Sequence, residues 1–219
     1  HLCYILLDID GVLLPIRSAD EAAEELLSSG ECDGRDPAFA FPHRCLAALS
    51  RIVASVEQFP TRRCRICLSS TWRANAESRQ HILDEFQHYA KRNPESPLGR
   101  IVDFELTTSM TNYSVRQWEV MEWVHQQQQQ QQQEEEEEQH HAAAADRESW
   151  SNFSWVVLDD DESCVEDARF RDACAPHTVL TDSKTGLTER DADRAIGVLL
   201  ESDDALTQLA ALRAALRAA

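Results

Sequence analysis

The sequence predicts an α/β fold built on a doubly wound, Rossmann-like parallel sheet. Short, continuous apolar runs, typical of strands buried on both faces, alternate along the chain with segments of helical period. Three of these runs end directly in Asp or Ser, as expected where parallel strands collect functional groups at their carboxyl ends. The length of 219 residues and the apolar fraction of 42% fit one medium-sized domain, so we expect residues 1–219 to fold as a single domain.

The predicted strands are the apolar runs themselves. They are residues 2–7, 65–68, 101–106, 155–158 and 177–180. The first run is apolar throughout and ends at Asp8, so we expect a central strand that is covered on both faces.

Helices are predicted where apolar residues recur at helical spacing. The predicted helices are residues 45–53, a segment that ends at Tyr89, residues 115–124 and residues 203–219. Thr188, with Asp191 three residues later, is typical of a helix start, so we expect a further helix after the last strand.

Two segments depart from this alternation. Residues 17–40 are acidic and rich in turn formers, which predicts a loop or an irregular helical excursion. Residues 126–149 form a low-complexity insert that begins with eight glutamines and five glutamates, and it is either disordered or a solvated continuation of the preceding helix. His140 and His141 lack a packed frame, so we expect no metal site there.

The charge of the chain bears on its partners. The formal net charge is −18, from 39 acidic and 21 basic side chains, and phosphate binding needs clustered basic residues. The overall charge therefore does not support a nucleic-acid partner, although a nucleic-acid end stays open as a substrate. No apolar run approaches the roughly 18 residues of a membrane span, so we expect no membrane partner.

The cysteines indicate the redox compartment. Seven cysteines, an odd number without a regular spacing, favour reduced thiols over a disulfide framework, so we expect an intracellular, cytoplasmic protein. Cys64 and Cys67 match C-x-x-C, but they lie in a strand-like run without a second pair, and we interpret them as structural. The chain begins at His1, so N-terminal targeting is not read from it.

Reactive side chains follow three of the predicted strands. Asp8 and Asp10 follow the first, Ser69, Ser70 and Thr71 follow the second, and the run Asp159, Asp160 and Asp161 follows the third. Converging carboxylates repel and raise one another's pKa unless a cation lies among them. A hard cation with oxygen ligands, most simply Mg²⁺, is therefore expected as the cofactor.

These residues resemble the haloacid dehalogenase (HAD) superfamily of phosphotransferases. The superfamily's first motif, D-x-D-G-[VT], matches residues 8–12, its second motif is a hydroxyl at a strand end, and its fourth is a pair of aspartates after a strand. A closer resemblance is to capless HAD domains of "Swiss Army Knife" RNA-repair proteins. The matching segments are residues 68–73, 116–124, 157–160 and 181–188.

The resemblance implies roles for individual residues. Asp8 is the expected nucleophile, and Asp10 the acid and base that protonates the leaving oxygen and then activates water. Gly11 is expected to leave room beside the phosphate, and either Ser70 or Ser69 to contact it. The Mg²⁺ ligands implied are Asp8, the Asp10 carbonyl and Asp160, with Asp159 or Asp161 in support or in its place.

One position departs from the superfamily pattern. The third motif is normally a lysine, and the spacing puts Arg116 there. Arginine keeps the charge but is a planar fork instead of a compact ammonium. The only lysines are Lys91, in a polar stretch where we expect it to be solvated, and Lys184, in the loop after the last strand.

The segments between the motifs are short, so no large cap domain is expected, and an open site suits a phosphate on a macromolecule or another bulky substrate. Five arginines flank the second motif, and they form either a local basic patch or ordinary solvated helix faces: Arg62, Arg63, Arg65, Arg73 and Arg79.

The expected function is a Mg²⁺-dependent phosphomonoesterase. The alternative is a catalytically weak HAD-fold module that binds a partner. A phospho-receiver domain is disfavoured, because its acidic pair and its phosphoacceptor follow the strands in the reverse order.

Overall fold

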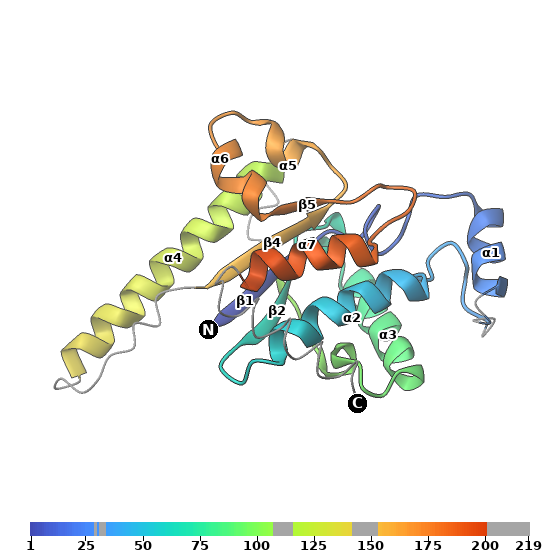
Figure 1. Ribbon diagram of the computed structural model, residues 1–219, viewed down its shortest axis with the longest axis horizontal. Coiled ribbons are helices and arrows are strands. Elements are labelled where there is room, and N and C mark those ends of the chain that lie inside the picture. Colours follow the sequence, from blue (N-terminus) through green and yellow to red (C-terminus); the bar gives the residue numbers. More distant parts are fainter. Residues whose placement is uncertain (29, 31–33, 107–115, 142–152, 201–219) are drawn as a thin grey trace, which may run out of the picture.

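A computed structural model describes residues 1–28, 30, 34–106, 116–141 and 153–200. Its centre is a parallel sheet of five strands in the order β3-β2-β1-β4-β5 (Figure 1). The strands are β1 (Leu2–Leu7), β2 (Arg63–Leu68), β3 (Glu105–Leu106), β4 (Ser154–Asp159) and β5 (Thr178–Leu180). The predicted doubly wound, Rossmann-like α/β fold is confirmed, because the chain builds the sheet outwards in both directions from β1.

Strand β1 is central because its side chains are apolar on both faces of the sheet. Cys3, Ile5 and Leu7 point into one core cluster, whereas Tyr4 and Leu6 point into the other. A strand that alternates between two buried faces has no solvated side, so its sequence is continuously apolar.

The register of the sheet brings the ends of three strands together. Leu7 of β1 lies opposite Leu68 of β2 on one side and Leu158 of β4 on the other. The residues that directly follow these three leucines therefore meet at one edge of the sheet.

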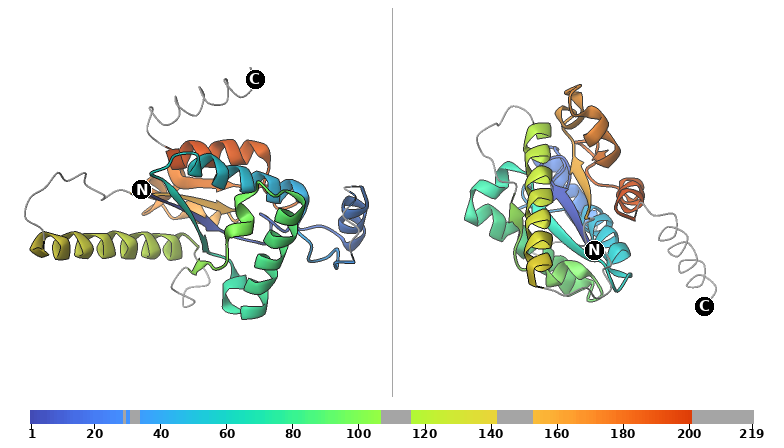
Figure 2. Two further views of the ribbon diagram at one scale, coloured as in Figure 1. Left: turned by 90° about the horizontal axis from the view of Figure 1, so that it is seen from below. Right: turned by 90° about the vertical axis from the view of Figure 1, so that its left-hand side faces the viewer.

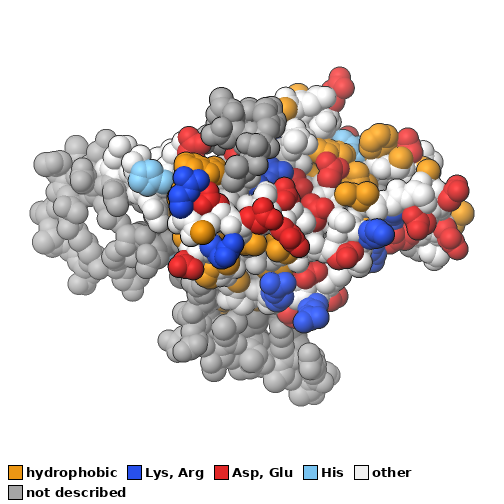
Figure 3. Space-filling view, turned by 90° about the horizontal axis from the view of Figure 1, so that it is seen from above, with side chains coloured by type: hydrophobic (Ala, Val, Ile, Leu, Met, Phe, Trp, Pro, Cys, Tyr) orange, Lys and Arg blue, Asp and Glu red, His pale blue; other side chains and the backbone are white. Residues whose placement is uncertain are grey.

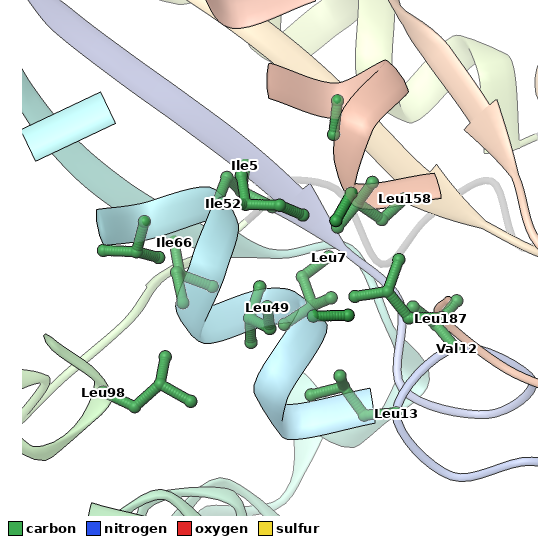
Figure 4. Close-up of a cluster of buried hydrophobic side chains, with 14 of the residues drawn as sticks. Ile5, Leu7, Val12, Leu13, Leu49, Ile52, Ile66, Leu98, Leu158 and Leu187 are labelled. Atoms are coloured by element: carbon green, nitrogen blue, oxygen red, sulfur yellow. The ribbon is translucent and has the colours of Figure 1, made fainter. Parts of the chain in front are cut away.

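Helices cover both faces of the sheet (Figure 2). The α-helices are α1 (Ala19–Ser28), α2 (His43–Glu57), α3 (Ala76–Arg92), α4 (Arg116–His141), α5 (Ser163–Glu166), α6 (Arg171–Cys174) and α7 (Glu189–Leu200). Helices α2 and α7 lie on one face, and Leu49 and Ile52 of α2 pack there with Leu7 and Leu158 (Figure 4). Helix α4 lies on the other face, where Trp123 is buried against Tyr4.

Short 3-10 turns join the main elements: η1 (Thr71–Ala74), η2 (Pro97–Arg100) and η3 (Ala175–His177). A short strand was expected near residues 101–106, and β3 lies there as Glu105–Leu106. Ile101 and Phe104 pack on the core but do not pair with β2. Their apolar character reflects burial, which gives a strand-like composition whether or not a segment is paired.

The helix after β5 begins where its cap was predicted. Thr188 Oγ1 accepts a hydrogen bond from the Asp191 backbone N–H (3.3 Å), and the Asp191 carboxylate accepts one from the Thr188 N–H (3.1 Å). This reciprocal pair is a capping box.

The glutamine tract continues helix α4. The helix begins at Arg116 and runs to His141, with its later turns beyond the sheet (Figure 1), and residues 142–149 of the predicted insert lie outside the described residues. The helix predicted over residues 203–219 also lies outside them. Of the helices that the structure describes, none is both long enough and apolar enough to cross a membrane.

Candidate active site at the carboxyl edge of the sheet

Three carboxylates converge at the edge where β1 and β4 end. Asp8 follows β1, Asp159 is the last residue of β4, and Asp160 comes next along the chain. One carboxylate oxygen from each lies within 4.8 Å of the others. Asp159 is fully buried, and Asp8 is 6% exposed. The strand register produces this cluster, since Asp8 and Asp159 follow directly opposed leucines.

The surroundings of these three carboxyl groups disfavour their charged forms, so their pKa values are raised. Burial, and then the neighbouring charge of Asp159, raise the pKa of Asp8 to about 7, although Arg116 and the Ser70 hydroxyl oppose the shift. Burial also raises the pKa of Asp159, against the effect of Arg116. The pKa of Asp160 is raised too, chiefly by burial and to a smaller extent by Asp161 and Asp10. Negative charge is therefore incompletely compensated by the protein itself.

Arg116 lies between the two buried aspartates. Its Nη2 is 3.5 Å from Asp8 Oδ1, and its Nε is 3.2 Å from Asp159 Oδ2. Burial on its own lowers the pKa of Arg116, but Asp159, Asp8 and Glu119 together raise it above the ordinary value. The guanidinium therefore stays charged at the position where the sequence pattern calls for a lysine.

The two lysines are in other surroundings. Lys91 is exposed in the last turn of α3. Lys184 is also exposed, and the carboxylates whose pKa it lowers are Glu21 and Asp182, which are not members of the cluster. Arg116 is thus the basic side chain that contacts the aspartates within the described part of the chain.

The two candidate serines differ in their contacts. The hydroxyl of Ser70 lowers the pKa of Asp8, and it accepts a hydrogen bond from the Trp72 N–H (3.4 Å). The hydroxyl of Ser69 is buried and has no hydrogen-bond partner among the residues that the structure describes. The carbonyl of Ser69, by contrast, accepts a hydrogen bond from Arg116. Ser70 is therefore the serine whose side chain reaches the proposed nucleophile.

Gly11 makes room for a carboxylate. Its φ is +73°, and a Cβ built on it would lie 2.2 Å from Asp160 Oδ2. The Gly11 carbonyl accepts a hydrogen bond from Thr181 Oγ1 (3.0 Å), so the loop is tied to the chain after β5. The role expected for Gly11 beside the phosphate stays a prediction; Asp160 lies where a side chain at position 11 would be.

Asp10 stands apart from the buried carboxylates. Its side chain is exposed, and it is not one of the three carboxylates in the cluster. Asp10 Oδ2 accepts a hydrogen bond from Trp72 Nε1 (3.0 Å). Trp72 was not predicted from the sequence to make this contact. Its position two residues after Ser70 was the available signal.

The five arginines near the second motif do not form one basic patch. Arg73 is 4% exposed, and it is paired with Glu119. Arg62 and Arg63 flank the start of β2, about 20 Å of extended chain from its carboxyl end. On the face in Figure 3, basic side chains are scattered among acidic ones. Burial and strand direction therefore separate Arg73 from Arg62 and Arg63, which argues against one patch made of all five arginines.

The donor set fits a divalent cation. Three carboxylates and the single guanidinium that contacts two of them leave a formal charge of −2 when all four groups are ionised. Carboxylate oxygens are the ligands that Mg²⁺ prefers, and a charge of +2 would balance the cluster. Asp161 is not in this cluster; its carboxylate accepts a hydrogen bond from the Ser163 N–H.

Comparison with known proteins identifies the family of the chain. Residues 4–192 match the family described as the HAD domain in Swiss Army Knife RNA repair proteins. No curated protein and no solved structure matches the chain. The matched region spans most of the sequence and contains the three carboxylates, Ser70 and Arg116. The chain therefore belongs to the family of HAD domains found in Swiss Army Knife RNA-repair proteins.

Proposed function

We propose that the protein is a Mg²⁺-dependent phosphomonoesterase that works through a phosphorylated Asp8. Membership of the HAD superfamily suggests a phosphohydrolase-type function. One observation carries the finer proposal: Asp8 shares a buried cluster with Asp159 and Asp160 and also contacts Arg116 and Ser70. The site therefore combines a nucleophile with a pair of carboxylates suited to a metal ion and with two groups suited to phosphate oxygens.

The chemistry assigned to the chain has two halves. In the first, an Asp8 oxygen attacks phosphorus, and the bond from phosphorus to the leaving oxygen breaks while Asp10 gives that oxygen a proton. In the second, Asp10 takes a proton from a water molecule that attacks phosphorus. The bond between Asp8 and phosphorus then breaks, which releases inorganic phosphate, restores the Asp8 carboxylate and leaves Asp10 protonated, as it was at the start.

Other residues support these two aspartates. The Trp72 N–H holds the Asp10 carboxylate at the edge of the site. The Arg116 guanidinium and the Ser70 hydroxyl are donors beside Asp8, and both suit an anion that gains charge during transfer.

Asp8, Asp159 and Asp160 are the side chains that would hold Mg²⁺, and the Asp10 carbonyl stays a prediction. HAD proteins generally use this ion. When bound, Mg²⁺ would supply positive charge that offsets repulsion between Asp8 and the phosphoryl group.

The substrate is proposed to be a bulky phosphomonoester, such as a phosphorylated macromolecule. The segment between β1 and β2 contains two helices, α1 and α2, and α2 belongs to the core of the sheet. Between β2 and α4 the described residues form α3, two 3-10 turns and β3. These described elements provide no separate cap domain, so the site suits a phosphate presented on a larger molecule.

The test is hydrolysis of p-nitrophenyl phosphate by the full chain, with Mg²⁺ or with EDTA. We expect turnover that requires Mg²⁺ and disappears in Asp8→Asn, whereas Asp84→Asn, an exposed change on α3, keeps the wild-type rate. Equal turnover by wild type and Asp8→Asn would contradict the proposal. If wild type binds Mg²⁺ but shows no turnover of this or other phosphomonoesters, the alternative of a weakly catalytic binding module replaces it.

A further inference from the structure

A buried ion pair beside the site has no part in the chemistry described so far. Arg73, in the 3-10 turn after β2, and Glu119, in the first turn of α4, are joined by a 3.0 Å contact between Nη2 and Oε2. Both side chains are only 3% exposed. Burying two charges costs free energy, so such a pair is weak support for stability. Its position suggests a different use.

Arg73 and Arg116 share the same two acceptors. Arg73 Nη1 donates to the carbonyl of Ser69 (2.8 Å), and Arg116 Nη1 donates to that carbonyl as well. Glu119 Oε2, which contacts Arg73, is also 3.4 Å from Arg116 Nη1. Arg73 additionally donates to the carbonyl of Ser70 (2.8 Å). The pair therefore touches both the arginine of the site and the strand end that carries Ser70.

We propose that Glu119, itself held by Arg73, is a positioning residue that keeps the Arg116 guanidinium from neutralising the metal-binding aspartates. This inference rests on the proposed function and deepens it. Glu119 touches neither Asp8 nor Asp159 in the contacts above; it acts through Arg116.

The physical reason is competition for the same carboxylates. A guanidinium between Asp8 and Asp159 supplies the positive charge that a bound cation would supply, so the two compete. The Glu119 carboxylate is a third anion on the same guanidinium, and it offsets part of the positive charge of Arg116. It also fixes the orientation of one edge of the planar guanidinium. Asp8 and Asp159 then keep more of their negative charge for Mg²⁺.

The same network explains why an arginine can serve at this position. Arg116 reaches Asp8 through Nη2, Asp159 through Nε, and Glu119 and the Ser69 carbonyl through Nη1. A lysine ammonium is one point with three donors, and it cannot spread over four acceptors in this way. Arg116 and Glu119 thus form one unit, three residues apart on the first turn of α4.

The test is a calorimetric Mg²⁺ titration of the full chain as wild type, Glu119→Gln and Glu85→Gln. Glu85 is a matched control, since it is also 3% exposed and is bonded to an arginine, Arg35 (2.7 Å), and to the Phe41 N–H (2.9 Å). We expect Glu119→Gln to raise the Mg²⁺ dissociation constant about tenfold or more, as loss of outer-shell partners does in metal sites. Glu85→Gln should lose stability but bind Mg²⁺ like wild type.

A second measurement separates positioning from general damage. In Glu119→Gln, the Mg²⁺ concentration for half-maximal p-nitrophenyl phosphate turnover should rise by the same factor as the dissociation constant, while kcat at saturating Mg²⁺ recovers most of the wild-type value. A purely structural role predicts a loss of kcat that Mg²⁺ does not restore.

The outcomes are distinct. Wild-type Mg²⁺ affinity in Glu119→Gln, or an equal loss in Glu85→Gln, overturns the inference. If Glu119→Gln does not fold, Glu119→Asp is used instead, because aspartate keeps the negative charge but moves it one methylene away from Arg116. Wild-type Mg²⁺ affinity in Glu119→Asp would also overturn the inference. If wild type itself neither binds Mg²⁺ nor releases phosphate, the proposed function fails, which is a different result.

Discussion

Replacement of Gly11 by alanine tests whether the Asp160 carboxylate can reach the cluster only because position 11 has no side chain. The added Cβ would lie 2.2 Å from Asp160 Oδ2 and 2.3 Å from Asp160 Cγ, distances that real Cβ atoms do not adopt. The Gly11 N–H donates to the Leu14 carbonyl (2.8 Å), and the Gly11 carbonyl accepts from Thr181 (3.0 Å). The backbone is held on both sides, so the Asp160 side chain is the part that moves.

Two separate costs follow from the structure. The φ of +73° is unfavourable for a residue with a Cβ, by roughly 1–2 kcal/mol. Displacement of Asp160 removes one of three carboxylates from the cluster, and we expect the Mg²⁺ dissociation constant to rise at least about tenfold, or about 1.4 kcal/mol. The first cost appears in folding stability, and the second appears in metal affinity.

A matched variant separates these two costs. Gly34 has a φ of +85° with nothing within 4 Å of its Cβ position, so Gly34→Ala pays only the backbone cost. Urea unfolding should show a stability loss in both variants, and calorimetry should show weakened Mg²⁺ binding in Gly11→Ala alone. If Gly11→Ala binds Mg²⁺ as tightly as wild type, the reasoning about Asp160 is refuted.

Three further predictions follow from the same contacts. Arg116→Lys cannot keep contacts to both buried aspartates, so the metal-free protein should lose about 1–3 kcal/mol in urea unfolding; an unchanged midpoint would contradict this. Trp72→Phe keeps a ring but loses the N–H to Asp10, so phosphate release should slow while folding stability changes by less than about 1 kcal/mol; an unchanged rate would remove Trp72 from the account. The folded pKa of Asp8, about 7, lies above its ordinary 3.8, so the folded state binds more protons between these pH values. Without Mg²⁺, the contribution of Asp8 to stability should therefore fall as pH rises from about 4 to about 7, by at most roughly 4 kcal/mol, and this part of the pH dependence should be absent from Asp8→Asn.

The strands and the aspartates were predictable because both depend on local sequence. A central parallel strand is apolar at every position, and in such a sheet the residue after each strand lies at the functional edge. These two facts placed Asp8, Asp159 and Asp160 together before any contact was known. The helix start at Thr188 was predictable for the same reason, since a capping box needs only four consecutive residues.

The remaining features depend on contacts between distant segments. The burial of Arg73 requires Glu119 from α4, 46 positions later, and an arginine next to a motif looks the same whether it is solvated or paired. The choice between Ser69 and Ser70 turns on which hydroxyl faces Asp8, and a one-residue shift at a strand end exchanges the two. The exact bounds of β3, Glu105–Leu106, were not predictable, because an apolar segment packed on the core has the composition of a strand whether or not it is paired.

The central claim, that Asp8 carries the phosphoryl group, is tested most directly by mass spectrometry of the Asp10→Asn variant quenched in acid during turnover of p-nitrophenyl phosphate with Mg²⁺. The p-nitrophenolate group leaves without protonation, whereas water attack lacks its base, so we expect phosphate to accumulate on the peptide that contains Asp8. The double variant with Asp8→Asn should carry none. Phosphate on another residue, or turnover by wild type with no phosphate on Asp8 in this variant, would contradict the claim.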